Sequence, residues 1–203
     1  NNNLELFYTN DLFALYLLHI EGGGHVKLQN RNGRNTSSYI SYDGTNGKPW
    51  NFISKYMRQQ NMISDSSTSS QRKYLENNPD RQEEIYGSCP SYVYFKKTID
   101  PPFGSDSVPL TDNRSIATDT NYYKFKGLLS YVVTERPAEN TNRNSSCRNR
   151  SFRPYSRFYL DQDTGGAIRG KARVDLYFGE GEYAEHAAHN IVRRGDLYFF
   201  MLK

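Results

Sequence analysis

The sequence predicts a folded, mainly β protein in two domains. Its mean hydropathy is low, at −0.84, but 17 Tyr and 11 Phe supply large side chains that can form cores. Short apolar and aromatic segments alternate with turns rich in Gly, Asn and Pro, which is typical of β proteins. The strongest break is Asp100–Gly104, where two adjacent prolines interrupt regular structure. We therefore expect one domain in residues 1–100 and a second in residues 101–203.

The first domain is expected to combine strands with a few short helices. Leu4–Ile20 is typical of a buried strand, although a helix over Leu12–Leu18 stays open because short apolar runs do not separate the two. Gly22–Gly24 predicts a hairpin or a ligand-facing turn, and Asn32-Gly33 predicts a two-residue turn. The other expected elements are strands at His25–Leu28, Ser38–Tyr42 and Tyr92–Lys96, helices at Pro49–Gln60, Ser70–Glu76 and Pro79–Tyr86, Asn78 as the N-cap of the last of these, and a serine-rich linker at Ser64–Ser70.

The second domain is expected to be built mostly of strands. Between two of them, Glu135–Arg157 holds six arginines and little that packs, so it predicts a solvated loop. A nucleic-acid-binding arm is disfavoured because few aromatic residues and no nucleic-acid motif accompany the arginines. We expect no nucleic-acid partner. The expected elements are strands at Arg114–Thr118, Leu128–Thr134, Arg157–Gln162, Arg173–Phe178 and Leu197–Leu202, with a helix near Glu182–Ile191.

Composition limits the other classes of function. A net charge of +4 suits an anionic polymer without identifying one. The two cysteines, Cys89 and Cys147, make neither a disulfide framework nor a metal cluster. His186 and His189 have the spacing of a metal pair, but no third ligand is evident, so we expect no metal and no cofactor. The longest apolar run, Leu12–Ile20, is too short to span a bilayer.

The stretch with the most chemistry is Gln162–Gly170. An expected strand delivers Asp163 to a turn, and Gly165 and Gly166 let the backbone approach a ligand or another strand closely. A carboxylate in this position can face a cleft. From spacing alone, however, an Asx-turn in which Asp163 bonds its own backbone is favoured.

Six stretches in order carry a more specific signal. Asp163–Gly170, continued by Val174–Gly179, and Ser115–Asp119 resemble the motifs of the 3D domain, named for three aspartates. The others are Ile20–Gly24, Tyr42–Gly47, Pro90–Phe95 and Val108–Leu110. Together they resemble the membrane-bound lytic transglycosylase A family of bacterial cell-wall enzymes. The resemblance implies a double-psi β-barrel (the 3D domain) in residues 101–203 and a smaller β-rich substrate-groove domain in residues 1–100.

The resemblance also implies a mechanism with one carboxylate. Asp163 protonates the glycosidic oxygen between N-acetylmuramic acid and N-acetylglucosamine, then accepts the proton of the C6 hydroxyl of the same muramyl ring. The tethered hydroxyl attacks in place of water and leaves a 1,6-anhydro end. An aspartate with an ordinary pKa near 3.9 is ionised at neutral pH, so the pKa of Asp163 must be raised. Asp119 and Asp175 are expected as supporting carboxylates, and Gly165 and Gly166 as donors near the developing charge.

The first domain is implied to contribute the glycan groove. Its expected contact residues are Glu21, Gly22, Gly23, Tyr42 and Asn46. Where the family pattern has Q-G-S-G, this chain has Glu21-Gly22-Gly23-Gly24, and where the family has Y-A-G, this chain has Tyr42-Asp43-Gly44. Both differences add a negative charge. The family also has an earlier segment, with a G-Y-Y-type motif, that contributes strands to the barrel. Nothing in this sequence matches that segment, so we expect the barrel to lack those upstream strands.

The expected setting is the bacterial envelope, at the periplasmic face of the outer membrane. The expected partner is the glycan strand of peptidoglycan, bound by a monomer, with any lipid anchor in a segment outside this chain. A second hypothesis keeps the same barrel as a non-catalytic glycan-binding module, since related barrels serve binding proteins. Retention of Asp119, Asp163 and Asp175 favours catalysis.

Overall fold

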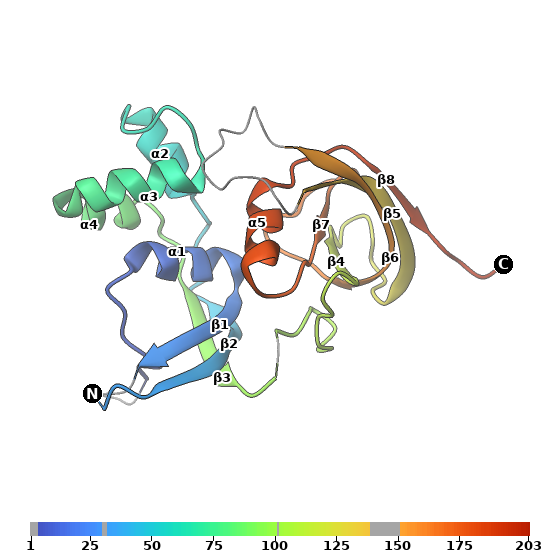
Figure 1. Cartoon of the computed structure of the whole chain (residues 1–203), viewed down its shortest axis with the longest axis horizontal. Helices are drawn as coiled ribbons and strands as arrows, with labels where there is room; N and C mark the ends of the chain where they lie inside the picture. The colour runs from blue at the N-terminus through green and yellow to red at the C-terminus, as the bar shows by residue number, and fades with distance from the viewer. Residues whose placement is uncertain (1–3, 30–31, 101, 139–150) are drawn as a thin grey trace. The chain divides into compact units, whose positions relative to one another are not determined.

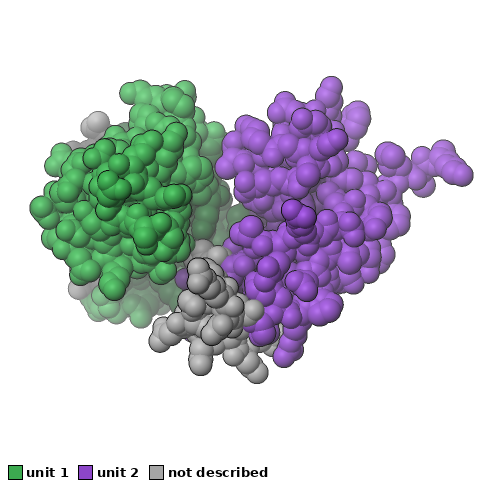
Figure 2. Space-filling view, turned by 90° about the horizontal axis from the view of Figure 1, so that it is seen from above, with its two compact units in different colours: residues 1–102 green, residues 103–203 purple. Residues whose placement is uncertain are grey.

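The computed structural model describes residues 4–29, 32–100, 102–138 and 151–203. It divides into two compact units, Asn1–Pro102 and Phe103–Lys203, which are coloured separately in Figure 2. The division falls inside the proline-rich segment Asp100–Gly104. Strands predominate in the second unit, and most helices lie in the first (Figure 1).

Unit 1 combines a three-stranded antiparallel sheet with short helices (Figure 1). Strand β2 lies between β1 and β3. Gln29 pairs with Asn35, so residues 30–34 connect β1 to β2, and this connection is longer than the two-residue turn predicted at Asn32-Gly33, although Gly33 has a positive φ of 75°. The elements in chain order are α1 (Leu12–Glu21), β1 (Gly23–Gln29), β2 (Asn35–Thr45), α2 (Ile53–Gln59), α3 (Thr68–Asn77), the 3₁₀ turn η1 (Pro79–Arg81), α4 (Gln82–Gly87) and β3 (Val93–Thr98).

Helix α1 overturns the strand predicted for Leu4–Ile20. The Asp11 carboxylate accepts a hydrogen bond from the Ala14 amide at 2.8 Å and caps the first turn. Gly22, at φ +75°, ends the helix by donating its amide to the Leu18 carbonyl at 2.9 Å. Gly22 is therefore a helix C-cap rather than part of a hairpin, and the helical alternative is confirmed.

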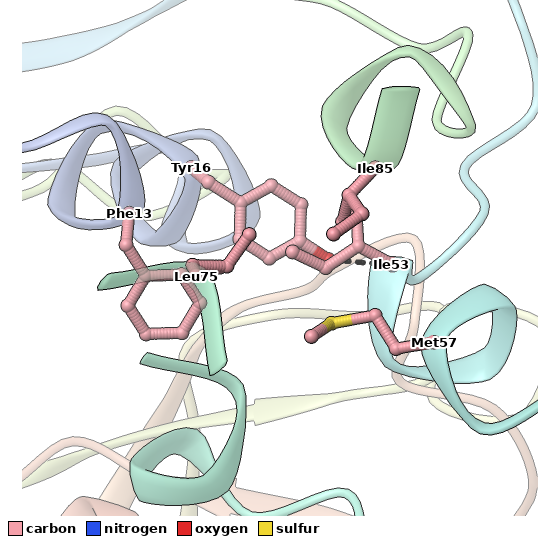
Figure 3. Packing of buried hydrophobic residues seen from close by; sticks show 6 residues of the cluster. All are labelled: Phe13, Tyr16, Ile53, Met57, Leu75 and Ile85. Carbon is pink, nitrogen blue, oxygen red and sulfur yellow. Dashed lines mark hydrogen bonds between the residues drawn. The ribbon is translucent and has the colours of Figure 1, made fainter. Parts of the chain in front are cut away.

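The core of unit 1 is hydrocarbon and aromatic, with one buried tyrosine hydroxyl. The Ile53 amide, at the start of α2, donates to the Tyr16 hydroxyl at 3.1 Å (Figure 3). This bond fixes the beginning of α2 four residues later than the predicted Pro49. The cluster consists of Phe13, Tyr16, Ile53, Met57, Leu75 and Ile85.

Two local predictions in unit 1 are corrected. The predicted serine linker is partly helical, because the Ser67 side chain accepts a hydrogen bond from the Ser70 amide at 3.2 Å and caps α3. Asn78 precedes η1, but its side chain donates to the Tyr74 carbonyl at 2.8 Å instead of capping the next helix. In both cases a local side-chain bond decides where the helix begins or ends.

Unit 2 is a five-stranded sheet in the order β7-β4-β6-β5-β8 (Figure 1). Strands β4 and β6 are parallel, and the other neighbours are antiparallel. The described residues form no closed barrel, so the double-psi β-barrel is not confirmed. Every predicted strand and the helix are present: β4 (Ser115–Thr118), β5 (Leu128–Pro137), β6 (Phe152–Asp163), β7 (Val174–Leu176), α5 (Glu182–Asn190) and β8 (Asp196–Phe199).

The solvated loop predicted at Glu135–Arg157 is wrong at both ends. Strands β5 and β6 continue into it and pair as far as Pro137 with Phe152. Tyr155 is buried, and the guanidinium groups of Arg136 and Arg157 lie over its ring at 5.1 and 5.5 Å. The arginines thus pack as cations on an aromatic face, while the central part of the segment lies outside the described residues.

Candidate active site

The sheet of unit 2 places its three predicted aspartates on, or directly after, the three neighbouring strands β7, β4 and β6. Strand β4 lies between β6 and β7, and Ala117 on β4 pairs with Asp163 on one side and Asp175 on the other. Asp119 follows the end of β4. Because neighbouring strands lie about 4.8 Å apart, the backbones of Asp163 and Asp175 are about 10 Å apart. The three aspartates of the motifs therefore lie close together in the fold.

The surroundings of Asp163 raise the pKa of its carboxyl. It lies half-buried at the end of β6, and its Oδ1 accepts a hydrogen bond from the Ser105 amide at 3.1 Å. Burial raises the pKa of the Asp163 carboxyl above its usual range, against the lowering effects of the Thr164 and Ser105 amides and of Lys126. Asp163 thus holds a proton more readily than an ordinary aspartate, which is the property required of a general acid.

Asp119 has the opposite environment. It is 1% exposed, its Oδ2 accepts the Gly170 amide at 2.7 Å, and its Oδ1 accepts the Asn121 amide at 3.0 Å. These two amides lower the pKa of Asp119, and Arg169, 3.8 Å away, adds to the effect. Asp119 is therefore an ionised brace between the end of β4 and the glycine turn.

Asp175 forms a surface ion pair. Its carboxylate receives two hydrogen bonds from Arg173, from Nε to Oδ1 at 3.0 Å and from the second guanidinium nitrogen to Oδ2 at 3.1 Å. Its side chain is 45% exposed. It is thus the more solvent-accessible neighbour of the half-buried Asp163.

The two glycines after Asp163 differ in the space around them. The Gly165 carbonyl accepts the Ile168 amide at 3.0 Å, and a Cβ at Gly165 would lie 3.3 Å from the buried Ile168 side chain. A Cβ at Gly166 would meet no atom within 4 Å. Gly165 therefore shapes the turn, and Gly166 leaves open space above it.

A buried polar cluster that was not predicted from the sequence lies two residues before Asp163. Asp161 is fully buried and forms an ion pair with Lys126 at 3.0 Å. The signal was present in the strand period, because Asp161 lies two residues after the inward-facing Tyr159 and must share its face. A charged residue at an inward strand position indicates a buried partner.

The five groove residues predicted in the first domain all lie in unit 1. Glu21 is the last residue of α1, Gly22 caps it, and a Cβ at Gly23 would lie 2.6 Å from the Ile40 carbonyl oxygen, so Gly23 permits the β1–β2 pairing. Tyr42, next to a β-bulge, is 54% exposed. Asn46 braces its loop by donating to the Pro90 carbonyl at 2.9 Å and accepting the Tyr92 amide at 3.0 Å.

These contacts do not test whether the five residues bind a glycan. Asp43, one of the departures that adds negative charge, is paired with Lys96 at 3.2 Å. An open hollow of about 590 Å³ in unit 1, lined by residues of α1, β1 and the segment Leu6–Thr9, includes none of the five. Ligand binding by unit 1 stays a prediction.

The described ranges contain neither a metal-binding cluster nor a membrane-spanning helix. No group of three or more His, Cys, Asp or Glu side chains there could hold a metal ion. No described helix is long and apolar enough to cross a bilayer.

Comparison with known families matches both units. The family model of the MltA specific insert domain matches residues 1–96, and that of the 3D domain matches residues 114–201. Membrane-bound lytic murein transglycosylase A of Escherichia coli K12 is 27% identical over 187 residues, which is 90% of this chain and 48% of that protein. This chain therefore spans about half the length of the curated relatives that it matches.

Solved structures show the same fold. The crystal structure of MltA from Neisseria gonorrhoeae has a TM-score of 0.77 and 28% identity, and the match covers 95% of this chain and 46% of that one. E. coli MltA with bound chitohexaose has a TM-score of 0.71 at 22% identity, over 95% of this chain and 55% of that one, and its likeness shows the fold alone. With both domain models matched in order, the chain belongs to the membrane-bound lytic transglycosylase A (MltA) family.

Proposed function

We propose that this chain carries the site of a peptidoglycan lytic transglycosylase. The reaction cleaves the β-1,4 bond from N-acetylmuramic acid to N-acetylglucosamine without water and leaves a 1,6-anhydro-muramyl end. Family membership and the name of the E. coli relative support this reaction. The observation that carries the proposal is the raised pKa of Asp163 at the end of β6, beside a glycine turn.

In the proposed mechanism Asp163 performs both proton transfers. Its carboxyl proton goes to the glycosidic oxygen, the bond from the muramyl C1 breaks, and the resulting carboxylate accepts the proton of the C6 hydroxyl as that oxygen bonds to C1. The hydroxyl is tethered to the reacting ring, so its effective concentration is high. Asp119 keeps the glycine turn against β4, and the amides at Gly165 and Gly166 face the developing charge. No cofactor takes part.

Asp175 is the competing candidate for the acid–base residue. Its side chain is accessible, and it shares a row with Asp163 across β4. The amides that bond Asp163 also suit a purely bracing role for that residue. The choice between the two carboxylates is decided by matched substitutions.

The test compares Asp163→Asn with Asp175→Asn on purified sacculi. General acid–base catalysis is worth about 10²–10⁴-fold, so we expect Asp163→Asn to lower product release at least that much. Circular dichroism should show both variants folded. Loss of release in Asp175→Asn, with near-normal release in Asp163→Asn, would transfer the acid–base role to Asp175.

The mass of the product separates the classes of reaction. Released muropeptides that lack one water relative to hydrolysis products support the transglycosylase. Hydrated reducing ends would show a hydrolase, which needs a second carboxylate. Sacculus binding by the wild-type chain without any release would support the alternative, a non-catalytic glycan-binding module on the same fold.

We also propose that Glu21, Gly22, Gly23, Tyr42 and Asn46 contribute to glycan binding from unit 1. Tyr42 is the cleanest test, because more than half of its side chain is exposed and its removal spares the core. Aromatic rings bury large areas on contact, so Tyr42→Ala should weaken binding of chitohexaose measured by calorimetry. Tyr8→Ala, at an 81% exposed tyrosine of the same unit, is the control.

The finer architecture and location are part of the same proposal. The parallel β4–β6 pair and the match to the 3D domain support a double-psi β-barrel. A closed barrel would protect the outer amides of β7 and β8 from hydrogen exchange, whereas an open sheet would leave them exposed.

We also propose that the protein is a monomer at the periplasmic face of the outer membrane and acts on peptidoglycan strands. Light scattering tests the monomeric state, and cell fractionation tests the location.

A further inference from the structure

Strand β6 contains a β-bulge immediately before Asp163. On β4, Ile116 and Ala117 are consecutive, but their partners on β6 are Asp161 and Asp163, so Gln162 is the extra residue. A bulge bends its strand and redirects the side chain that follows. The direction of the Asp163 carboxyl therefore depends on what holds this bulge.

A buried three-residue cluster holds the strand on one side of the bulge. The Lys126 ammonium donates to Asp161 Oδ1 at 3.0 Å, to Thr118 Oγ1 at 2.8 Å and to the Thr118 carbonyl at 3.3 Å. The Thr118 hydroxyl donates to Asp161 Oδ2 at 2.7 Å. An ammonium has three donors, and all three are used here. The side chains of Lys126 and Asp161 are 6% and 0% exposed.

Further bonds complete the attachment. The Gly127 amide, next to Lys126, donates to the Asp161 carbonyl at 2.6 Å. The Ser115 hydroxyl donates to the Gln162 side-chain oxygen at 2.6 Å. The end of β4, the segment that leads into β5, and both residues before Asp163 are thus joined in one network.

We propose that Lys126 is a positioning residue of the active site: through Asp161 and Thr118 it fixes the bulge of β6 and so aims the Asp163 carboxyl. This proposal rests on the proposed function, which makes Asp163 the catalytic residue. The position of the Asp163 carboxyl, however, can be measured in a protein that shows no activity. The Ser105 amide, bonded to Asp163 Oδ1, is the local reporter.

The charges around Asp163 agree with this role. Burial raises the pKa of Asp163, Lys126 lowers it and Asp161 raises it, while the amides of Thr164 and Ser105 lower it. In the same row across β4 lies the ion pair of Asp175 with Arg173. The Lys126–Asp161 pair is therefore close enough to act on the Asp163 carboxyl as well as to hold its strand.

The competing explanation is that the ion pair only stabilises the fold. Replacement of all three side chains of the cluster by apolar ones separates the two explanations, because a buried polar group can often be exchanged for well-packed hydrocarbon with no loss of stability if none of its partners is left unsatisfied. We expect Lys126→Met/Thr118→Val/Asp161→Leu to melt near the wild type yet lose the hydrogen-exchange protection of the Ser105 amide. A melting temperature and a Ser105 protection that both match the wild type would overturn the proposal.

Single substitutions supply a second readout, the titration of the Asp163 carboxyl followed by carbon NMR. Lys126→Met should raise the pKa of Asp163 and Asp161→Asn should lower it, each relative to the wild type. Val132→Ala, in the core of the same sheet, is the control for a general loss of stability and should leave the titration unchanged. Equal shifts in all three variants would show an unspecific effect and overturn the proposal.

Activity, where the wild-type chain shows it, gives the third readout. A displacement of about 1 Å can cost ~10²-fold in rate, so we expect the triple variant to lose about that factor in kcat with KM little changed. If the wild-type chain releases no product, the proposed function fails, and the Ser105 and Asp163 measurements still decide whether Lys126 positions the bulge.

Discussion

The two units differ in what they bury. Unit 1 packs six large apolar and aromatic side chains, and Gln71, a buried polar residue of this unit, bonds the Ser66 carbonyl at 2.9 Å within the same local turn. Unit 2 buries a set of polar and charged side chains near the site, namely Ser115, Thr118, Asp119, Ser130 and Asp161. The contrast is between a core built for stability and a core that also positions polar groups.

This difference bears on where the chemistry lies. A buried polar group costs free energy unless its hydrogen bonds are satisfied, so a fold that needs only stability uses hydrocarbon. In unit 2 the cost is offset by bonds that converge on the strand ends before Asp119 and Asp163. We infer that the sheet of unit 2 is built around the site.

The largest effect should come from the hydrocarbon core of unit 1. Leu75 is 1% exposed inside the cluster, and Leu75→Ala should lower the free energy of unfolding by about 2–5 kcal/mol through lost contacts and a cavity. Trp50, the single tryptophan of the chain, packs against this cluster, so its fluorescence during urea unfolding reports on unit 1. Leu12→Ala, at a 42% exposed leucine, is the control and should change little.

The same measurement can contradict the contrast between the two cores. The loss in Leu75→Ala should not depend on pH, because no charge is involved. An unchanged urea midpoint would mean that the unit 1 cluster does not carry its stability.

The next effect concerns Asp119 and depends on pH. Hydrogen bonds from Gly170 and Asn121 hold its native pKa below the unfolded value of about 3.9. Asp119 therefore contributes stability above that value and loses it as pH falls through the lower native pKa. Asp119→Asn should be less stable than the wild type near pH 7, with the gap closing in acid, as measured by thermal melts followed by circular dichroism.

Hydrogen exchange locates this effect. Asparagine keeps only one of the two acceptor oxygens, so at least one of the Gly170 and Asn121 amides should lose protection in Asp119→Asn. The control is Asp196→Asn, at an exposed residue of β8. A stability gap that stays constant down to strongly acidic pH would show that the carboxylate charge of Asp119 is not the cause.

A smaller effect is expected at His19, whose ring joins α1 to β3 through a hydrogen bond. The His19 Nδ1 accepts the Val93 amide at 3.2 Å, and burial lowers the pKa of the ring below its usual value near 6.5. The neutral ring is thus favoured in the folded state, and stability should fall as pH drops below about 6.5 toward the native pKa. Loss of the acceptor leaves a backbone amide unpaired, which costs about 1–3 kcal/mol.

Trp50 fluorescence during unfolding at pH 5 and pH 7.5 measures this loss in unit 1. His19→Gln keeps an acceptor without a titratable ring, so the difference between the two pH values should shrink. An undiminished difference in His19→Gln would assign the pH dependence to another group.

The smallest effect is expected at the cap of α3. Ser67→Ala removes the side-chain acceptor of the Ser70 amide and should lower stability by about 1 kcal/mol. Ser66→Ala, at the exposed neighbouring serine, is the control. Equal losses in both variants, measured by Trp50 fluorescence in urea, would show that the cap itself contributes nothing specific.

Sequence patterns were sufficient for the elements of unit 2. Its five strands and its helix were predicted from short apolar and aromatic runs, or from helical spacing, beside clear turns. Sequence patterns failed where local hydrogen bonds or strand pairing decide the structure. Asp11 and Gly22 turned an apolar run into a helix, and the stacking of Arg136 and Arg157 on Tyr155 extended two strands into an arginine-rich segment.

Residue types and their spacing are enough to identify the family, the order of the motifs and the three aspartates, because these features are written in the linear chain. The tertiary structure alone separated their environments. Burial raises the pKa of Asp163, backbone amides lower that of Asp119, and Arg173 pairs with Asp175, although all three are the same amino acid. Desolvation and hydrogen bonding come from neighbours distant in the chain, such as Ser105, Lys126 and Gly170, and only the folded sheet brings these to the carboxylates.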